Sequence, residues 1–178
     1  DYFFFFNAGE QGRINHFMNK TNLFDLASSS GLRVIKTWQL SGNAPIPEDI
    51  IYPCFSKPAN SALYAKSGIG VSYSIKELEK RLKDCNDLLV QEYIDKDYEI
   101  NINGFSYNNG KDIKFDAVCR KIRDYSDRQS QYMVLEDISL HSYVDYDSIR
   151  NLVRYIGYEG LFSVEFLIKK GISYFLEI

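Results

Sequence analysis

Two short apolar stretches, residues 162–168 and 173–178, restrict the fold more than any other feature of the sequence. Each has the length and composition of a β-strand, and Lys169-Lys170-Gly171 between them is typical of a hairpin turn. Side chains alternate along a strand, so the apolar residues at even positions of the first stretch share one face and Glu165 points to the other. These residues are therefore predicted to form a hairpin with one core face and one face that carries an acidic group.

The hairpin contains two glutamates, Glu165 and Glu177, whose relative position depends on the turn. A loop with an odd number of residues puts both on the same face, whereas a two-residue turn puts them on opposite faces. Two carboxylates at close distance destabilise each other unless a cation lies between them. Oxygen ligands favour Mg²⁺, which takes one or two carboxylates and completes its shell with water and phosphates. The hairpin alone is equally compatible with two solvated glutamates.

The rest of the sequence contains both strand and helix patterns, which predicts an α+β fold. Ser74 followed by Glu77 is a helix-start signal, and Asn108-Asn109-Gly110 is a strong turn signal between two strands. Residues 60–70 and 124–131 are polar and are expected to form loops. Helices are expected at residues 19–29, 74–84 and 147–155, and further strands at 2–6, 34–40, 51–57, 88–93, 98–105 and 113–122.

Composition and charge exclude several function classes. The 178 residues carry a net charge of −3, which gives no electrostatic basis for binding nucleic acid or an anionic membrane. No apolar stretch is long enough to cross a bilayer, and no signal peptide is recognisable. The three cysteines are far apart, which favours reduced thiols in a cytoplasmic protein. With two histidines and no glycine-rich phosphate motif, neither a histidine zinc site nor a P-loop is expected.

An ordered series of short motifs remains. It consists of Asn19-Lys20 at a helix start, Tyr52-Pro53 running to Lys57-Pro58, Gln91-Glu92-Tyr93-Ile94, Glu99, Glu165 and Glu177. From about Lys20 to the last residue, the sequence resembles the ATP-grasp superfamily. Within it, the sequence is most similar to the bacterial carboxylate–amine ligases related to the carbamoyl-phosphate synthase large chain. Two phrases support this narrower resemblance: Cys119-Arg120-Lys121-Ile122-Arg123-Asp124 and Gly160-Leu161-Phe162-Ser163-Val164-Glu165-Phe166.

The resemblance implies the ATP-grasp fold, in which two α+β lobes hold ATP between them. It divides the chain into four segments. These are residues 1–16, the end of a mostly missing N-terminal domain; 17–50, a connecting helix and strand; 51–94, a small lobe with a phosphate flap; and 95–178, a larger lobe truncated at its C-terminus.

The resemblance also implies a role for each motif residue, with ATP and Mg²⁺ as cofactors. The metal ligands would be Glu165 and Glu177. The nucleotide contacts would come from Lys20 and Lys57 at the phosphates, from the backbone of Glu92, Tyr93 and Ile94 at the adenine edge, and from Glu99 at the ribose hydroxyls.

Two further regions would supply the catalytic groups. Residues 60–70 would form a flap that covers the phosphates and contributes Lys66, and its closure would exclude water from a hydrolysable acyl phosphate. Arg120 is the expected cation near the transferred phosphoryl group, where charge builds up. Lys121 and Arg123 remain alternatives to Arg120, because strand parity does not settle which of them faces the site.

The implied reaction is that of an ATP-dependent ligase. A small carboxylic acid would be activated as an acyl phosphate, and an amine would then displace the phosphate, so that ADP and phosphate are released. Two alternatives stay open: a carboxylase-type ATP-grasp enzyme that activates bicarbonate, and a nucleotide-binding regulatory module without catalysis. The expected partners are the small acid and the amine, with no nucleic acid and no membrane, in the cytoplasm. The sequence leaves the oligomeric state open, and a homodimer is compatible with it.

Overall fold

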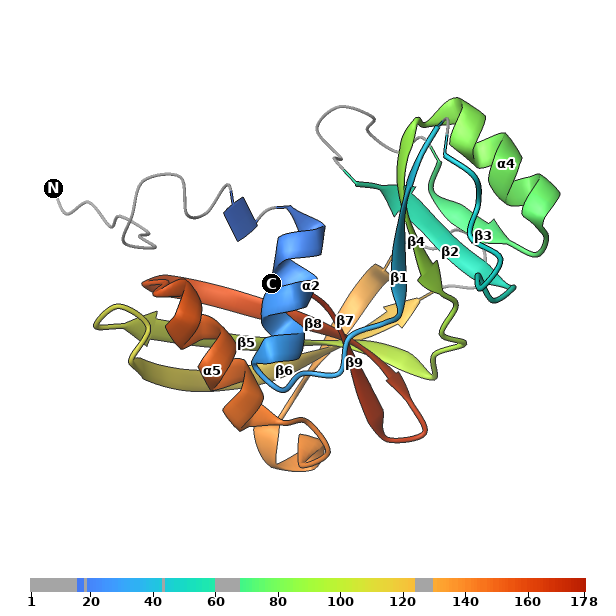
Figure 1. Cartoon of the computed structure of the whole chain (residues 1–178). Helices are drawn as coiled ribbons and strands as arrows, with labels where there is room; N and C mark the ends of the chain where they lie inside the picture. Colours follow the sequence, from blue (N-terminus) through green and yellow to red (C-terminus); the bar gives the residue numbers. More distant parts are fainter. Residues whose placement is uncertain (1–15, 18, 43, 60–67, 124–129) are drawn as a thin grey trace, which may run out of the picture. The chain divides into compact units, whose positions relative to one another are not determined.

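The computed structural model describes residues 16–17, 19–42, 44–59, 68–123 and 130–178 (Figure 1). These residues divide into two compact units. The larger unit takes Asp95–Ile178 together with the described part of Asp1–Val34, and the smaller unit is Ile35–Ile94. The helix and the strand of the segment 17–50 therefore fall in different units. The strand expected at residues 2–6 lies outside the described residues.

The larger unit is built on an antiparallel sheet of five strands. Asn108, Asn109 and Gly110 lie between two of its neighbouring strands, and the Lys111 N–H donates to the Asn108 carbonyl at 3.2 Å. Asn109 and Gly110, the two central residues of this turn, have positive φ, as a turn of the primed type requires. The turn predicted at these residues is confirmed. In spatial order the strands are β7 (Ser130–Glu136), β6 (Asp112–Arg123), β5 (Tyr98–Tyr107), β8 (Gly160–Lys169) and β9 (Ile172–Glu177).

Two helices, α2 (Lys20–Ser29) and α5 (Tyr146–Ile156), cover one face of this sheet (Figure 1). Their apolar residues pack on the even-numbered side chains of β5 and β8, among which Ile100 and Phe166 are almost completely buried. Since side chains alternate along a strand, the odd-numbered residues of β5 point to the opposite face. The helices thus define a core face, and the second face carries polar residues such as Glu99 and Glu165 beside exposed apolar ones such as Phe105.

Local signals determine where these two helices begin and end. The Asn19 side chain caps α2 by accepting a hydrogen bond from Thr21 N at 3.0 Å. Asp145 caps α5 in the same way, and Gly157 ends it in the left-handed conformation, which glycine adopts without steric penalty. Both helices agree with the sequence-based prediction within one or two residues. No helix in the described ranges is long and apolar enough to cross a membrane.

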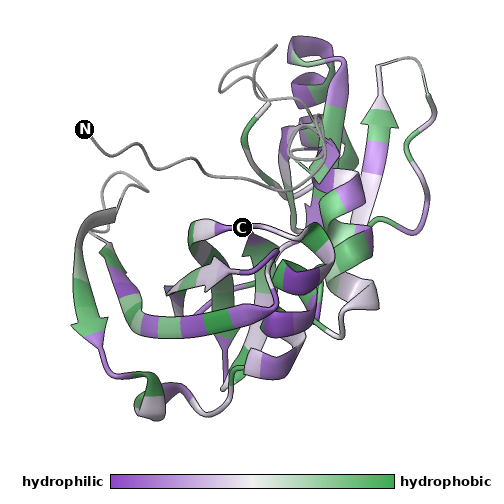
Figure 2. Cartoon of the chain, turned by 90° about the vertical axis from the view of Figure 1, so that its left-hand side faces the viewer, coloured by the Kyte–Doolittle hydropathy of each residue, from purple (hydrophilic) through white to green (hydrophobic). Residues whose placement is uncertain are grey.

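The smaller unit has an antiparallel four-stranded sheet with α4 (Ile75–Asp84) packed on one face. Ser74 caps α4 as predicted, and Leu78 and Leu82 point into the core. At the top of Figure 2, α4 carries hydrophilic residues along much of its length beside this apolar stripe. In spatial order the strands are β1 (Thr37–Ser41), β4 (Asp87–Glu92), β2 (Cys54–Pro58) and β3 (Gly70–Ser72).

Two edge strands were absent from the prediction. β3 has three residues and is held by Arg81 of α4, whose guanidinium donates to the carbonyls of Ile69 and Val71 at 3.0 Å. β7 begins in a stretch expected to be a loop, and it is followed by the 3₁₀ helix η1 (Ile138–His141). Short edge strands form because a neighbouring strand or side chain satisfies their backbone groups, and the pattern of their own residues does not show this.

Candidate functional site

The two glutamates of the last hairpin lie opposite each other. Glu165 and Glu177 are register partners, so their side chains leave the same face of the sheet. The turn between the strands has only two residues, Lys170 and Gly171, and Leu176 forms a β-bulge that shifts the register by one. Without this bulge, Glu165 would pair with Leu176 and Glu177 would turn to the other face. The bulge therefore creates the shared face that a two-residue turn alone would prevent.

The register extends the same face across neighbouring strands. Glu165 pairs with Asn101 of β5, and in the next row Glu99 of β5 pairs with Lys121 of β6. Along each strand these residues alternate with residues whose side chains pack in the core. Their own side chains therefore point away from α2 and α5. We call a group of four charged residues on this face, Glu99, Lys121, Glu165 and Glu177, the carboxylate face.

Ion pairs connect the charged groups of the carboxylate face. Lys121 Nζ contacts Oε1 of Glu165 and lies 3.5 Å from Oε2 of Glu99, so it bridges two strands. Lys96 contacts the other carboxylate oxygen of Glu99. Glu99 and Glu165 are only 5% and 8% exposed. Carboxylates this deeply buried stay charged only beside compensating cations, and these lysines provide them.

A further ion pair lies at the edge strand of the sheet. Lys20, the first residue of α2, has its Nζ 3.6 Å from Oε2 of Glu177. Four of the predicted site residues are thus brought together within the larger unit: Lys20, Glu99, Glu165 and Glu177.

Arg120, the expected catalytic cation, points to the core face. It pairs with the buried Ile100, and its Nε donates to Oε1 of Glu136 at 2.7 Å. Successive residues of a strand point to opposite faces, so Arg120 and Lys121 cannot both face Glu165. The structure does not bring Arg120 to the carboxylates and places the alternative, Lys121, among them. The side chain of Arg123, the third candidate, lies outside the described part.

Arg120 belongs instead to a polar cluster that ties η1 to the sheet. Nε2 of His141 lies 3.0 Å from Oε2 of Glu136, without the alignment of a hydrogen bond, and its Nδ1 lies 2.6 Å from the Tyr143 hydroxyl. That hydroxyl is also 3.1 Å from the hydroxyl of Tyr98. Burial, together with the hydrogen bond to Tyr98, raises the pKa of Tyr143 above its ordinary value.

Two neighbours of the carboxylate face were not predicted from the sequence. Lys96 contacts Glu99 from the turn before β5, three residues earlier in the chain. Asn101 follows Glu99 at the strand period of two, and its Nδ2 donates to Ser163 Oγ at 3.2 Å. The Asn101 Oδ1 atom is buried and has no hydrogen-bond partner among the described residues. Strand alternation from Glu99 is a signal that predicts the position of Asn101.

The smaller unit holds the other predicted nucleotide contacts. Lys57 pairs with Leu89 of β4 on the face opposite α4. Glu92 ends β4, and its N–H donates to the carbonyl of Lys36 at 3.0 Å. Within the described ranges, no backbone hydrogen bond engages Tyr93 or Ile94, the two residues after it. Lys66 and most of the predicted flap lie outside the described residues.

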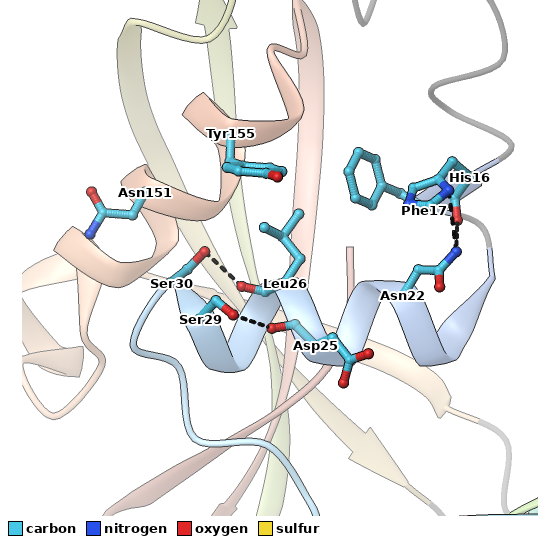
Figure 3. Close-up of a pocket in the computed structure, with 9 residues that line it drawn as sticks. All are labelled: His16, Phe17, Asn22, Asp25, Leu26, Ser29, Ser30, Asn151 and Tyr155. Carbon is cyan, nitrogen blue, oxygen red and sulfur yellow. Dashed lines mark hydrogen bonds between the residues drawn. The ribbon is translucent and has the colours of Figure 1, made fainter.

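A pocket in the larger unit lies between α2 and α5, on the helix side of the sheet (Figure 3). None of the predicted site residues lines it. Its walls combine polar and aromatic side chains: His16, Phe17, Asn22, Asp25, Leu26, Ser29, Ser30, Asn151 and Tyr155. The carboxylate face and this pocket are therefore separate features of the larger unit.

The donors on the carboxylate face suit a hard cation. Glu165 and Glu177 offer carboxylate oxygens from adjacent strands. Among the described residues, no group of three or more His, Cys, Asp and Glu side chains gathers to hold a metal ion. Two carboxylates fit Mg²⁺, which keeps waters and phosphate oxygens in its shell, and do not suffice for a structural zinc site.

Comparison with known proteins identifies the fold. No protein-family model matches the chain. It is 32% identical over 166 residues to a formate-dependent phosphoribosylglycinamide formyltransferase of Wolinella succinogenes, covering 84% of this chain and 39% of that protein. An L-amino acid ligase from Bacillus licheniformis shares the fold with a TM-score of 0.71 at 18% identity, over 93% of this chain and 40% of that one.

A D-alanine–D-alanine ligase from Bacillus anthracis, whose crystal structure contains ATP, aligns with a TM-score of 0.68 at 17% identity. The match covers 93% of this chain and 54% of that one. The chain thus spans about two fifths to a half of the relatives that it matches. The α+β architecture and the resemblance stated from the motifs are both confirmed. The chain has the ATP-grasp fold.

Proposed function

We propose that this chain is the nucleotide-binding part of an ATP-dependent ligase. The enzyme activates a small carboxylic acid as an acyl phosphate, an amine displaces the phosphate, and ADP and phosphate leave. The observation that carries this proposal is the carboxylate face, where Glu165 and Glu177 are register partners beside Lys121. The ligases among the structural relatives, which act on amino acids, support an acid and an amine as substrates.

In this proposal each unit supplies nucleotide contacts of its own. Lys57 contacts the phosphates, and the free backbone edge at Tyr93 and Ile94 accepts the adenine. Glu99 accepts hydrogen bonds from the ribose hydroxyls, and Lys20 lies near the phosphates. A lysine ammonium is suited to these contacts because it is a compact point charge with three donors.

Glu165 and Glu177 would hold Mg²⁺. When bound, the metal neutralises phosphate charge and orients the γ-phosphoryl group for attack. The other proposed roles belong to residues of this chain. Lys121 replaces Arg120 as the cation that stabilises negative charge on the transferred phosphoryl group, because it lies on the face of Glu165. The role of Lys66 stays a prediction.

The direct test is acid-dependent and amine-dependent ADP release by the full-length protein. We expect Mg²⁺-dependent ADP formation that requires one member of a panel of small acids and increases when the matching amine is added. The matched control is Glu79→Gln, an exposed site on α4 that keeps full activity while Glu177→Gln loses it. Tight Mg·ATP binding without turnover on any mixture contradicts the proposal, and ADP formation that requires bicarbonate supports the carboxylase-type alternative.

We also propose that the protein acts in the cytoplasm. The observation behind this is chemical: Cys54, Cys85 and Cys119 are all free thiols. Unpaired cysteines are typical of reducing compartments.

A further inference from the structure

Each glutamate of the proposed metal pair already has a lysine as its counter-ion. Lys121 Nζ contacts Oε1 of Glu165, and Lys20 Nζ lies 3.6 Å from Oε2 of Glu177. The two lysines come from different elements, β6 and α2, so the pairing does not arise from one local motif. The carboxylate oxygens that Mg²⁺ would need are therefore engaged by the protein itself.

Among the described residues, ion pairs link three lysines to three glutamates: Lys20, Lys96 and Lys121 with Glu99, Glu165 and Glu177. A divalent cation that enters this cluster alone brings two more positive charges beside three ammonium groups, where side chains are partly withdrawn from water. Such charges are strongly unfavourable without a new anionic partner.

The two ion pairs differ in strength. The side chains of Lys121 and Glu165 are 15% and 10% exposed, so water screens their attraction only weakly. Those of Lys20 and Glu177 are 22% and 51% exposed, which makes this pair the weaker one. Lys121 is therefore the main obstacle to a cation at Glu165, and Lys20 is a secondary one at Glu177.

We propose that Lys121 and Lys20 close the carboxylate pair to free divalent cations and release it only when a polyphosphate binds. This inference rests on the proposed function. The phosphates offer the two ammonium groups an alternative anionic partner, and the carboxylates then become available to the metal. No proton moves: each lysine exchanges a carboxylate for a phosphate, and each carboxylate exchanges an ammonium for the metal. The metal therefore binds only together with the nucleotide.

The test uses Mn²⁺ as the probe, in the absence of nucleotide, with the full-length protein. Free Mn²⁺ is followed by electron paramagnetic resonance during titration. We expect the wild type to bind Mn²⁺ weakly and Lys121→Met to bind it at least about tenfold more tightly, since removal of one contacting charge changes such equilibria by this order. Lys20→Met should give a smaller gain. Lys111→Met, the same charge change at an exposed turn residue, should give none.

A double variant tests whether Glu165 is the carboxylate that binds Mn²⁺ once Lys121 is removed. Lys121→Met with Glu165→Gln should return to the weak binding of the wild type, because the released carboxylate is then missing. Thermal unfolding provides a second readout: Mn²⁺ should raise the Tm of Lys121→Met and leave that of the wild type unchanged. If Lys121→Met does not fold, the gain in Mn²⁺ affinity of Lys20→Met alone decides whether the inference holds.

Two outcomes overturn the inference: nucleotide-free wild type that binds Mn²⁺ as tightly as the lysine variants, or lysine variants that gain no affinity. Failure of the proposed function is a distinct result. It is seen when Mn·ATP added to the wild type causes no change in water-proton relaxation, whatever the nucleotide-free titrations give.

Discussion

Glu165 and Glu177 face each other across the β8–β9 hairpin because Leu176 bulges out of register. Like charges directly opposite each other in a sheet destabilise it by a few tenths of a kcal/mol to about 1 kcal/mol. Lys121 and Lys20 offset this repulsion. The arrangement is therefore more easily understood as a binding site than as a stabilising feature of the hairpin.

The first prediction separates function from stability at Glu177. Its side chain is half exposed and its lysine partner is 3.6 Å away, so Glu177→Gln should change the free energy of unfolding by less than about 0.5 kcal/mol. The same substitution should lower Mg²⁺-dependent ADP formation by roughly 100-fold, because a metal ligand is lost. Urea unfolding and steady-state ADP release measure the two quantities. A large loss of stability would show that Glu177 is a structural residue.

The second prediction distinguishes the two neighbouring basic residues of β6. Lys121→Met should reduce kcat strongly, because it removes the cation on the carboxylate face. Arg120→Met should keep kcat per folded molecule and lower the free energy of unfolding by about 1–3 kcal/mol, because Glu136 loses its charged hydrogen-bond donor. Activity normalised to the folded fraction decides between them. Loss of kcat in Arg120→Met alone would restore Arg120 as the catalytic candidate.

The third prediction concerns the layer between helices and sheet. Phe175 is fully buried and makes edge-to-face contacts with Phe24 of α2 and Phe166 of β8. Phe175→Ala should lower the free energy of unfolding by about 3–5 kcal/mol, since it removes these contacts and leaves a cavity. Chemical denaturation of both proteins gives the difference. Tyr107→Ala, at a position 45% exposed, is the control and should cost about 0.5 kcal/mol or less.

The fourth prediction is a pH dependence at the start of α5. Asp145 accepts hydrogen bonds from the backbone N–H and the hydroxyl of Ser148, and these bonds lower its pKa below the ordinary value of 3.8. The folded pKa is below the unfolded one, so this contribution is complete above the unfolded pKa and is lost as the pH falls through the folded pKa. Asp145→Ala should therefore be less stable than the wild type by about 1 kcal/mol at pH 7.

Denaturant unfolding over a pH series measures this contribution. The difference between Asp145→Ala and the wild type should shrink as the pH falls below about 3.8, where the unfolded chain takes up a proton that the folded Asp145 does not yet bind. Asp145→Asn keeps the capping geometry without the charge and should show most of the stability with little of the pH dependence. A difference that grows toward acidic pH would contradict the assigned direction of the pKa shift.

The sequence predicted well those features that depend on neighbouring residues. Asn19 and Ser74 cap their helices where expected, and the turn at Asn108 joins β5 to β6. Each of these signals acts through hydrogen bonds or φ angles within a few residues, so it can be recognised from the sequence alone. The edge strands β3 and β7 have no such signal and were not predicted.

The sequence by itself determined which residues carry charge near the last hairpin, and the alternation that keeps Arg120 and Lys121 on opposite faces. Only the tertiary structure decided which of the two faces the carboxylates, and that Glu165 and Glu177 share a face. The reason is physical. Register and bulges are set by how strands pair and by which face the helices bury, and these are contacts between residues far apart in the chain.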